Sequence, residues 1–516
     1  MLAGRRDARY WWALAIVLGL ALGLRALVYV VAPEVHHPDQ IFQTLEQAHR
    51  LVFGWGATLW EQEYGVRSWL LPGALALVVA AASLLSADPV VYLGAVATVC
   101  ILLSLIAPLV AFDLAYRQFG LTGAVIAAVV PATWVDLVYF APHTLSEPIA
   151  THALLLAAFL TMRTGLTPRD GVAIGALLGL TFLLRFHFAF AIAAVVLWCL
   201  IQDRACGLRV VLSGIGVVIG GGFLDLLTLG LPWQSIWLNF YLNIVYRVSQ
   251  EWGAQPWYWY IDMLLTCLSG GGIALLFFSA ASGRSGVLLL SIAAIVLLTH
   301  SAVAHKEYRF IYPAIELGAV AAGLGLARVV EWCRHSMRSG MPPGMPHWAQ
   351  WTLVAAGVGL MPSISAATAI SPPYQQYVFR RNFAVVQAAR LVREQPDLCG
   401  IGLRVPLPNT GGYSHWHRQV PLIDLSSLSQ SEGFAALAPG FNVLVYVAGQ
   451  EHGQTLGYVP LGCERTVCVA RRAGSCEAVS SPPGSARPRP LRNADPADVT
   501  ASVRAWALDW LPAALR

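Results

Sequence analysis

The chain has 516 residues, 57% of them hydrophobic and only 12% charged, and it carries a formal net charge of +5. Soluble globular domains are roughly one quarter charged, so this composition excludes an ordinary soluble enzyme and favours a polytopic membrane protein. The sequence has no basic block interleaved with aromatic residues, which argues against a nucleic-acid-binding protein.

Apolar runs recur along the chain up to about residue 370 and are the candidates to cross the roughly 30 Å hydrocarbon core of a bilayer. The first follows a basic N-terminus and lacks a cleavage site, so we expect an uncleaved span. We predict about eleven transmembrane helices, near residues 10–32, 90–116, 121–140, 146–162, 171–184, 187–201, 208–230, 257–280, 286–303, 308–328 and 348–370.

The apolar run 69–86 determines the orientation of everything after it. If this run lies at the interface or re-enters the membrane, most arginines between the spans fall on one side, which the positive-inside rule assigns to the cytoplasm. If it crosses, most of them move outside. We therefore expect that 69–86 does not span, and that the polar segment 33–89 and the tail face the extracytoplasmic side.

The composition changes after residue 370, where the predicted membrane domain 1–370 ends. Residues 371–516 mix short apolar strands, such as 442–447, with turn residues, which predicts a small soluble α/β-like extracytoplasmic domain. Residues near 480–495 are rich in proline and serine and are expected to be a disordered linker. This tail holds four cysteines, which permits disulfides in an oxidising compartment. They are Cys399, Cys463, Cys468 and Cys476.

Asp39 lies in the polar segment that follows the first predicted span. A carboxylate can accept the proton of an attacking hydroxyl, and a phosphate leaving group needs cations rather than a second acid. Asp39 is therefore a candidate base. The alternative is that Asp39 caps a helix that begins near Ile41. Glu46 stands about two helical turns further on and could share a face with Asp39.

Residues 305–310 lie at a predicted junction of two spans on the outer side. Lys306 and Arg309, one helical turn apart, could hold a phosphate group. The alternative is that both side chains snorkel to the interface, with Glu307 as their counter-ion. Arg185 stands in a very short turn between apolar runs, where an arginine is costly unless it is paired or faces water. A functional role and a structural pair both stay open for it.

Several motifs follow one another along residues 1–420. In chain order they include His37-Pro38-Asp39-Gln40, Phe42-Gln43, Trp60-Glu61, Arg67-Ser68, Thr144-Leu145-Ser146-Glu147, Pro256-Trp257-Tyr258-Trp259-Tyr260 and His305-Lys306-Glu307-Tyr308-Arg309-Phe310. This series resembles the glycosyltransferase family 22 mannosyltransferases, a GT-C fold family whose members extend GPI anchors and lipid-linked oligosaccharides. Two positions depart from the family pattern. Gln40 stands where a second acid is usual, and Leu59 stands where threonine often precedes the Trp-Glu pair.

The resemblance implies an inverting mannosyltransferase that takes a sugar, expected to be mannose, from a polyprenyl-phosphate donor and passes it to a lipid-linked or envelope glycan. It places the catalytic base at Asp39. The implied donor-binding residues are Lys306, Arg309, His305 and Arg185. The implied acceptor-binding or sugar-binding residues are His37, Gln40, Glu46, Trp60 and Arg67.

No cofactor is expected, because fixed cations can stabilise a leaving phosphate, although the residues leave a divalent metal open. The expected partners are the lipid-linked donor, the glycan acceptor and membrane lipids. The tail beyond about residue 420 does not match the family, and the chain has no ER-type retention signal, so we expect a bacterial source, with the site facing the periplasm from the inner (plasma) membrane. The rival function is a transporter or flippase for a lipid-linked sugar. Inverted repeats would favour it, and the sequence shows none.

Overall fold

The structure is a computed structural model of the chain, and it describes residues 7–340, 347–379, 383–425, 432–449, 457–464 and 466–477. The chain divides into two compact units. Unit 1 consists of Met1–Val31, Ala97–Phe223 and Trp252–Phe379, and unit 2 consists of Ala32–Val96, Leu224–Glu251 and Arg380–Arg516. This division differs from the expected one, because the polar segment after the first helix belongs to the same unit as the C-terminal tail.

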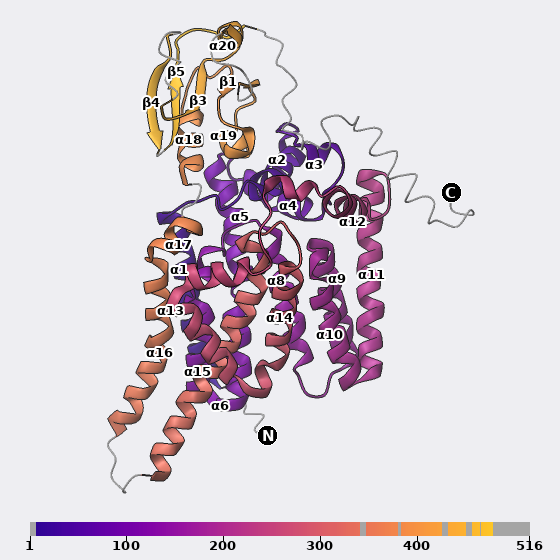
Figure 1. The fold of residues 1–516 in the computed structure, drawn as a ribbon, viewed down its shortest axis with the longest axis vertical. Coiled ribbons are helices and arrows are strands. Elements are labelled where there is room, and N and C mark those ends of the chain that lie inside the picture. Colours follow the sequence, from indigo (N-terminus) through magenta and orange to yellow (C-terminus); the bar gives the residue numbers. More distant parts are fainter. Residues whose placement is uncertain are drawn as a thin grey trace, which may run out of the picture. The chain divides into compact units, whose positions relative to one another are not determined.

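In its described residues, unit 1 contains helices joined by turns and loops, and no strand (Figure 1). Two further helices, α5 (Pro89–Ser104) and α11 (Arg204–Leu229), have residues in both units. The helices of unit 1 are α1 (Ala8–Val31), α6 (Ile106–Thr133), α7 (Val135–Tyr139), α8 (Ser146–Thr161), α9 (Pro168–Leu184), α10 (Ala189–Gln202), α13 (Trp259–Ala281), α14 (Val287–Ser301), α15 (Tyr312–Gly340), α16 (His347–Ala369) and α17 (Pro372–Tyr377), with the short 3-10 turns η2 (Phe186–Phe188), η5 (Gly283–Gly286) and η6 (Tyr308–Ile311).

Seven helical segments in the described part of the chain are long and apolar enough to cross a membrane. They are Ala8–Val31, Pro89–Thr133, Arg204–Leu229, Trp259–Ala281, Gly283–Ser301, Tyr308–Met337 and Gln350–Ala369. Pro89–Thr133 would be about 68 Å long if straight, but its helical backbone breaks at Gly120, where φ is 69°. It covers two of the predicted spans.

Three of the predicted spans coincide with shorter helices, α8 with 16 residues, α9 with 17 and α10 with 14. The count of about eleven spans therefore stays a prediction. The run expected not to cross forms α4 (Leu70–Ser83), whose 14 residues rise only about 21 Å. Its length agrees with the expected interfacial or re-entrant position, although α10 is equally short.

The centre of unit 1 is α15, which packs against α6, α13 and α14. The closest approaches between the backbones of these helices occur at glycines. A side chain at Gly325 would begin 1.7 Å from the backbone oxygen of Phe278, and one at Gly323 would begin 2.1 Å from that of Ala127. Small residues that let backbones meet are typical of helix packing inside a membrane. In α1, Trp12 and Ile16 are 72% and 70% exposed, as expected for side chains that face lipid.

Unit 2 combines short helices with one sheet. Its helices are α2 (Glu46–Phe53), α3 (Trp60–Glu63), α4, α12 (Gln234–Phe240), α18 (Phe383–Arg393), α19 (Gly412–Trp416) and α20 (Glu432–Leu437), with the π-helices η1 (Gln40–Leu45) and η3 (Tyr241–Val245) and the 3-10 turns η4 (Val248–Trp252, ending in unit 1), η7 (Leu407–Asn409) and η8 (Ala438–Gly440). The strands are β1 (Ile401–Leu403), β2 (Leu422–Asp424), β3 (Val443–Val447), β4 (Val459–Glu464) and β5 (Val467–Arg471).

The five strands form one mixed sheet in the order β2-β1-β3-β5-β4 (Figure 1). Strand β1 pairs in parallel with β2 and β3, whereas β5 pairs antiparallel with β3 and β4. Alternate residues of β3 enter different cores. Val443 and Val445 join residues of α18 and α19, and Leu444 joins Phe434 of α20. Helices therefore supply apolar residues to the cores on both faces of the sheet, which confirms the predicted α/β-like domain.

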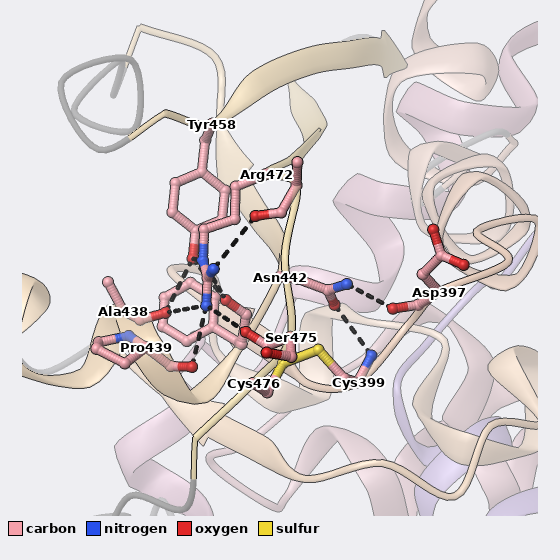
Figure 2. The surroundings of a disulfide bond; sticks show 11 residues. Asp397, Cys399, Ala438, Pro439, Asn442, Tyr458, Arg472, Ser475 and Cys476 are labelled. Carbon is pink, nitrogen blue, oxygen red and sulfur yellow. Dashed lines mark hydrogen bonds between the residues drawn. A yellow bond between two sulfur atoms is a disulfide. The ribbon is translucent and has the colours of Figure 1, made fainter.

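All four cysteines of the tail form disulfides, Cys399–Cys476 and Cys463–Cys468. Figure 2 shows how the first is supported by hydrogen bonds. The Asn442 amide donates to the Asp397 carbonyl at 2.6 Å, and its oxygen accepts from the Cys399 N–H at 3.0 Å. The Arg472 guanidinium donates to the carbonyl of Pro439 at 3.0 Å. The linker predicted near 480–495 lies outside the described residues.

Candidate functional site

Asp39 stands at the start of η1, whose first turn is built on the carbonyl of Pro38. The N–H groups of Ile41 and Phe42 donate to that carbonyl at 3.0 and 2.9 Å. The backbone of Asp39 is already helical, and its side chain makes no capping hydrogen bond. Its Oδ1 lies 3.3 Å from Nδ1 of His37, and both side chains are about one quarter exposed. The capping alternative is therefore wrong, and the carboxylate of Asp39 reaches solvent.

A second carboxylate, Glu61 in α3, links the helix that follows Asp39 to Arg67. Gln43 of η1 donates to Oε2 of Glu61 at 2.9 Å, and Arg67 donates to Oε1 through two nitrogens at 3.0 and 2.7 Å. A two-nitrogen contact fixes the plane of the guanidinium as well as its position. The Arg67 side chain remains 27% exposed, so its predicted contact with an acceptor is geometrically possible.

Glu46 does not have the exposure that its predicted role requires. The residue is fully buried, and its carboxylate accepts three backbone N–H groups, from Ala57 at 2.6 Å, Ser414 at 2.8 Å and Tyr413 at 3.2 Å. Burial raises the pKa of Glu46, and the three N–H groups oppose that rise. The helix between Asp39 and Glu46 is a π-helix, so the spacing used to place the two carboxylates on one face does not apply. The predicted role of Glu46 in binding the acceptor is therefore corrected, and its carboxylate makes a structural contact instead.

Two other predicted acceptor-binding residues are also internal. Trp60 is 8% exposed and packs in a cluster with Tyr64, Leu238 and Leu242. Gln40 is 5% exposed, and its side-chain oxygen accepts from the N–H of His36 at 3.0 Å. These contacts favour internal roles for both side chains, and sugar binding by Trp60 or Gln40 stays a prediction. Local sequence does not distinguish a buried tryptophan from one at a membrane interface.

Unit 1 holds a separate group of charged residues around Glu147, which begins α8 with Ser146. Glu147 is fully buried, and its Oε1 lies 2.7 Å from Nη2 of Arg185 and 3.5 Å from Nη1 of Arg309. Both guanidiniums also lie over the ring of Phe310, with centroid distances of 5.0 and 5.2 Å. The Glu147 carboxylate and the Phe310 ring thus hold two buried guanidinium groups. Each would attract an anion more strongly here than in water, because the effective dielectric constant is lower.

The segment 302–307 completes this group. Glu307 accepts from Nε of Arg309 at 2.6 Å and lies 3.0 Å from Nε2 of His305. Burial lowers the pKa of His305, but the hydrogen bond and negative charge of Glu307 outweigh it, so the pKa of His305 is raised overall. Glu307 is the counter-ion that the alternative interpretation required, although Arg309 is buried within the unit rather than snorkelling.

Lys306 is 6% exposed, and its Nζ donates to the backbone oxygens of Gln255 and Val303. Burial lowers its pKa. Residues 302–307 are not helical, and Arg309 belongs to η6, so Lys306 and Arg309 are not one helical turn apart as expected. Both remain candidates for holding a phosphate. Lys306 lies in a loop and Arg309 lies in a 3-10 turn.

Comparison with known protein families identifies the family to which these motifs belong. Residues 17–378 match the model of the Alg9-like mannosyltransferase family. The chain belongs to the Alg9-like mannosyltransferase family. This confirms the resemblance inferred from the motifs, and with the apolar helices it makes the chain an integral membrane protein.

Individual members of the Alg9-like family are similar to the chain at modest identity. A GPI alpha-1,2-mannosyltransferase 3 of Danio rerio is 27% identical over 60% of this chain and 59% of its own length. A GPI mannosyltransferase 3 of Yarrowia lipolytica is 25% identical over 75% of this chain and 72% of its own length. The match therefore spans less than two thirds of the zebrafish relative. These relatives are eukaryotic and lend no support to the predicted bacterial source.

Solved structures extend the likeness beyond the Alg9-like family. The crystal structure of ArnT from Cupriavidus metallidurans bound to undecaprenyl phosphate has a TM-score of 0.57 and 12% identity, and it covers 92% of this chain and 100% of that one. Identity this low shows only the fold. The fold is the predicted GT-C type, a polytopic helical membrane protein with a C-terminal sheet domain.

Three residues of this Alg9-like chain make these contacts and were not among the predicted site residues. Glu147 is a carboxylate in an otherwise apolar run, which is a signal that the sequence offered, since such a residue is costly without a partner. Ser414 and its neighbour Tyr413 contribute only backbone N–H groups to Glu46. Backbone donors leave no trace in side-chain identity, so no sequence signal could have revealed that contact.

Proposed function

We propose that this protein is an inverting mannosyltransferase that takes mannose from a polyprenyl-phosphate donor and passes it to a hydroxyl of a lipid-linked or envelope glycan. The observation that carries the proposal is Asp39, a partly exposed carboxylate at the start of an otherwise buried helix in a member of the Alg9-like family. His37 lies beside it, where its Nδ1 accepts the backbone N–H of Asp39 at 3.2 Å and is 3.3 Å from the carboxylate. We propose no roles in substrate contact for Glu46, Trp60 or Gln40.

The proposed reaction needs one base. Asp39 accepts the proton of the acceptor hydroxyl while the hydroxyl oxygen forms a bond to the anomeric carbon of mannose. The bond from that carbon to the phosphate oxygen breaks on the opposite face, and the phosphate leaves with the electron pair, so the configuration inverts. A lipid phosphate is a stable anion, which is why no second carboxylate is required to protonate it.

Arg185, Arg309 and Lys306 are the proposed partners of the donor phosphate, with His305 beside them. The two arginines are already held by Glu147 and Phe310, so little conformational freedom remains to be lost when an anion binds. The structural neighbour bound to undecaprenyl phosphate supports a polyprenyl phosphate as the donor class. These fixed cations are proposed to act without a metal ion or other cofactor, which transfer in the presence of a chelator would test.

The acceptor is proposed to be a glycolipid on the extracytoplasmic side. Two disulfides in the tail support that side, because disulfides persist in oxidising compartments. The names of the relatives make a GPI-type glycolipid one acceptor to assay beside other lipid-linked glycans. A bacterial plasma membrane with the site facing the periplasm stays a prediction.

The test is mannose transfer by purified protein from polyprenyl-phosphate mannose to a membrane-lipid extract. We expect Asp39→Asn to lose at least about a hundredfold in activity, since general base catalysis contributes about 100- to 10,000-fold. Asp88→Asn is the matched control, because Asp88 lies in the same segment and is 53% exposed. Its Oδ1 lies 3.7 Å from Arg393 and accepts the N–H of Val90 at 2.8 Å, a bond that an asparagine oxygen can also accept. Full activity in a folded Asp39→Asn protein would contradict the proposed base. No transfer by the wild type with any polyprenyl-phosphate sugar would contradict the function.

A further inference from the structure

The C-terminal domain contacts the helix that starts at Asp39 through a small set of residues that we call the α19 contact: Phe42, Glu46 and His49 on the helix side and Gly412, Tyr413, Ser414 and His417 on the domain side. Glu46 is its centre. Two of the three N–H groups that its carboxylate accepts come from α19, and the third, from Ala57, comes from the polar segment. One buried carboxylate therefore joins segments that are 367 and 11 residues away from it in sequence.

The same side of the helix makes further contacts with α19. His49, three residues after Glu46, lies 3.0 Å from His417 between Nε2 and Nδ1. Phe42 lies in a cluster that Tyr413 packs against. The hydroxyl of Tyr92 donates to the carbonyl of Ser414. Contacts at positions 42, 46 and 49 fix both the position and the rotation of η1 and α2, as a single contact would not.

The helix that is held in this way includes a π-helix. η1 runs from Gln40 to Leu45, directly between Asp39 and Glu46. π-helical turns carry one extra residue compared with an α-helix, are intrinsically rare and occur mostly at functional sites. If η1 relaxed to an α-helix, the residues before it would turn by about 100° relative to α2. External contacts within the π-turn, at Phe42, and directly after it, at Glu46, oppose that relaxation.

We propose that Glu46 is a positioning residue, and that the C-terminal domain serves to hold the proposed base Asp39 in its working orientation. This inference rests on the proposed function for the role of Asp39. The competing interpretation is that the α19 contact only attaches the domain to the rest of the chain. The two differ in what happens to the chemistry when the contact is weakened and the protein remains folded.

Two substitutions weaken the α19 contact from opposite sides. Glu46→Gln replaces one acceptor oxygen by an amide that faces N–H donors. Gly412→Ala leaves Glu46 in place, but the added Cβ would lie 2.8 Å from its Oε2 at a residue with φ of +62°. Gly449→Ala is the matched control, because Gly449 lies in the same domain with φ of +87° and has no atom within 4 Å of the added Cβ. It carries similar backbone strain without touching the contact.

We expect Glu46→Gln and Gly412→Ala each to lower kcat per folded molecule at least about tenfold, with KM for donor and acceptor within twofold. The double variant should be no worse than the poorer single variant, because both remove the same contact. The acidic limb of the kcat profile against pH should also move, since the surroundings of the base change. Gly449→Ala should leave kcat and the pH profile as in the wild type. Folded protein is quantified by size-exclusion chromatography.

A purely structural role would reduce the amount of folded protein and lower the whole pH profile without displacing it. That result, or an unchanged kcat in both variants, would overturn the positioning role while Asp39→Asn still reports on the proposed function. Hydrogen exchange in residues 40–45 supplies a readout independent of activity. Faster exchange in Glu46→Gln and Gly412→Ala, but not in Gly449→Ala, is expected, and equal protection in all three would also overturn the proposal. If one of the two variants fails to fold, the other provides the same test.

Discussion

His49 and His417 lie 368 positions apart in the sequence, yet Nε2 of His49 lies 3.0 Å from Nδ1 of His417. The other ring nitrogen of His49 lies 3.0 Å from the carbonyl of Trp55. Because that carbonyl only accepts, His49 carries its proton on Nδ1 and accepts a hydrogen bond from His417. Protonating His49 at Nε2 would set two N–H groups against each other. The contact between the first polar segment and the tail therefore requires a neutral histidine.

This pair predicts that the stability of the protein falls in mild acid. Burial, then the charges of His417 and His415, lower the pKa of His49 to about 4, whereas an unfolded histidine has a pKa of about 6.5. The unfolded chain therefore binds the proton first, and the stability from His49 is complete above pH 6.5 and is lost as the pH falls towards 4. The shift corresponds to about 3 kcal/mol.

Thermal unfolding in detergent between pH 7 and pH 4 would measure this loss, and His49→Gln should make the dependence shallower. Some dependence should remain, because burial also lowers the pKa of His417 and of His415. The charges of Asp88, Arg418 and Arg393 also act on His417, and the variant leaves these groups unchanged. An identical pH dependence in wild type and His49→Gln would show that another group is responsible.

Arg185 is predicted to affect the binding of the donor and not the binding of the acceptor. It shares Glu147 with Arg309, and a hydrogen bond to a charged partner contributes about 1.5–3 kcal/mol. Arg185→Gln should therefore raise KM for polyprenyl-phosphate mannose about ten- to a hundredfold, with KM for the acceptor unchanged. Arg163→Gln is the control, since Arg163 is 44% exposed and pairs with Asp170, away from Glu147 and Arg309 in the sequence. Equal effects on both KM values would argue that Arg185 maintains the fold alone.

Trp60 is predicted to contribute to stability rather than to sugar binding. Its ring packs with Tyr64, Val66 and Leu242, and truncating a buried tryptophan costs about 3–5 kcal/mol. Trp60→Ala should lower the free energy of unfolding by about that amount, whereas Trp237→Ala, at a residue that is 44% exposed in the same unit, should change it far less. A stable Trp60→Ala protein with a raised KM for the acceptor would restore the sugar-binding interpretation.

The sequence was sufficient to predict what depends on local pattern. Long apolar runs became helices, the short apolar run at 442–447 became strand β3, and the spaced motifs around Asp39 and Lys306 indicated the family. It was insufficient where a residue's role depends on a partner far along the chain. Glu46 was predicted to contact the acceptor because nothing in the neighbouring sequence shows that N–H groups of α19 bind its carboxylate. Four cysteines likewise allow three pairings, and only the fold of the sheet selects one.

The two disulfides are predicted to contribute unequally to the stability of the tail. Cys399–Cys476 closes a loop with a sequence separation of 77, and Cys463–Cys468 one with a separation of 5. Chain entropy assigns about 4.5 kcal/mol to the longer loop and about 2 kcal/mol to the shorter. Cys399→Ala with Cys476→Ala should therefore accelerate hydrogen exchange in β1 and β3 more than Cys463→Ala with Cys468→Ala. The second double variant is the control for losing a disulfide as such, and it removes the buried Cys468. If it loosened β1 and β3 more, local packing rather than loop closure would govern the stability of this domain.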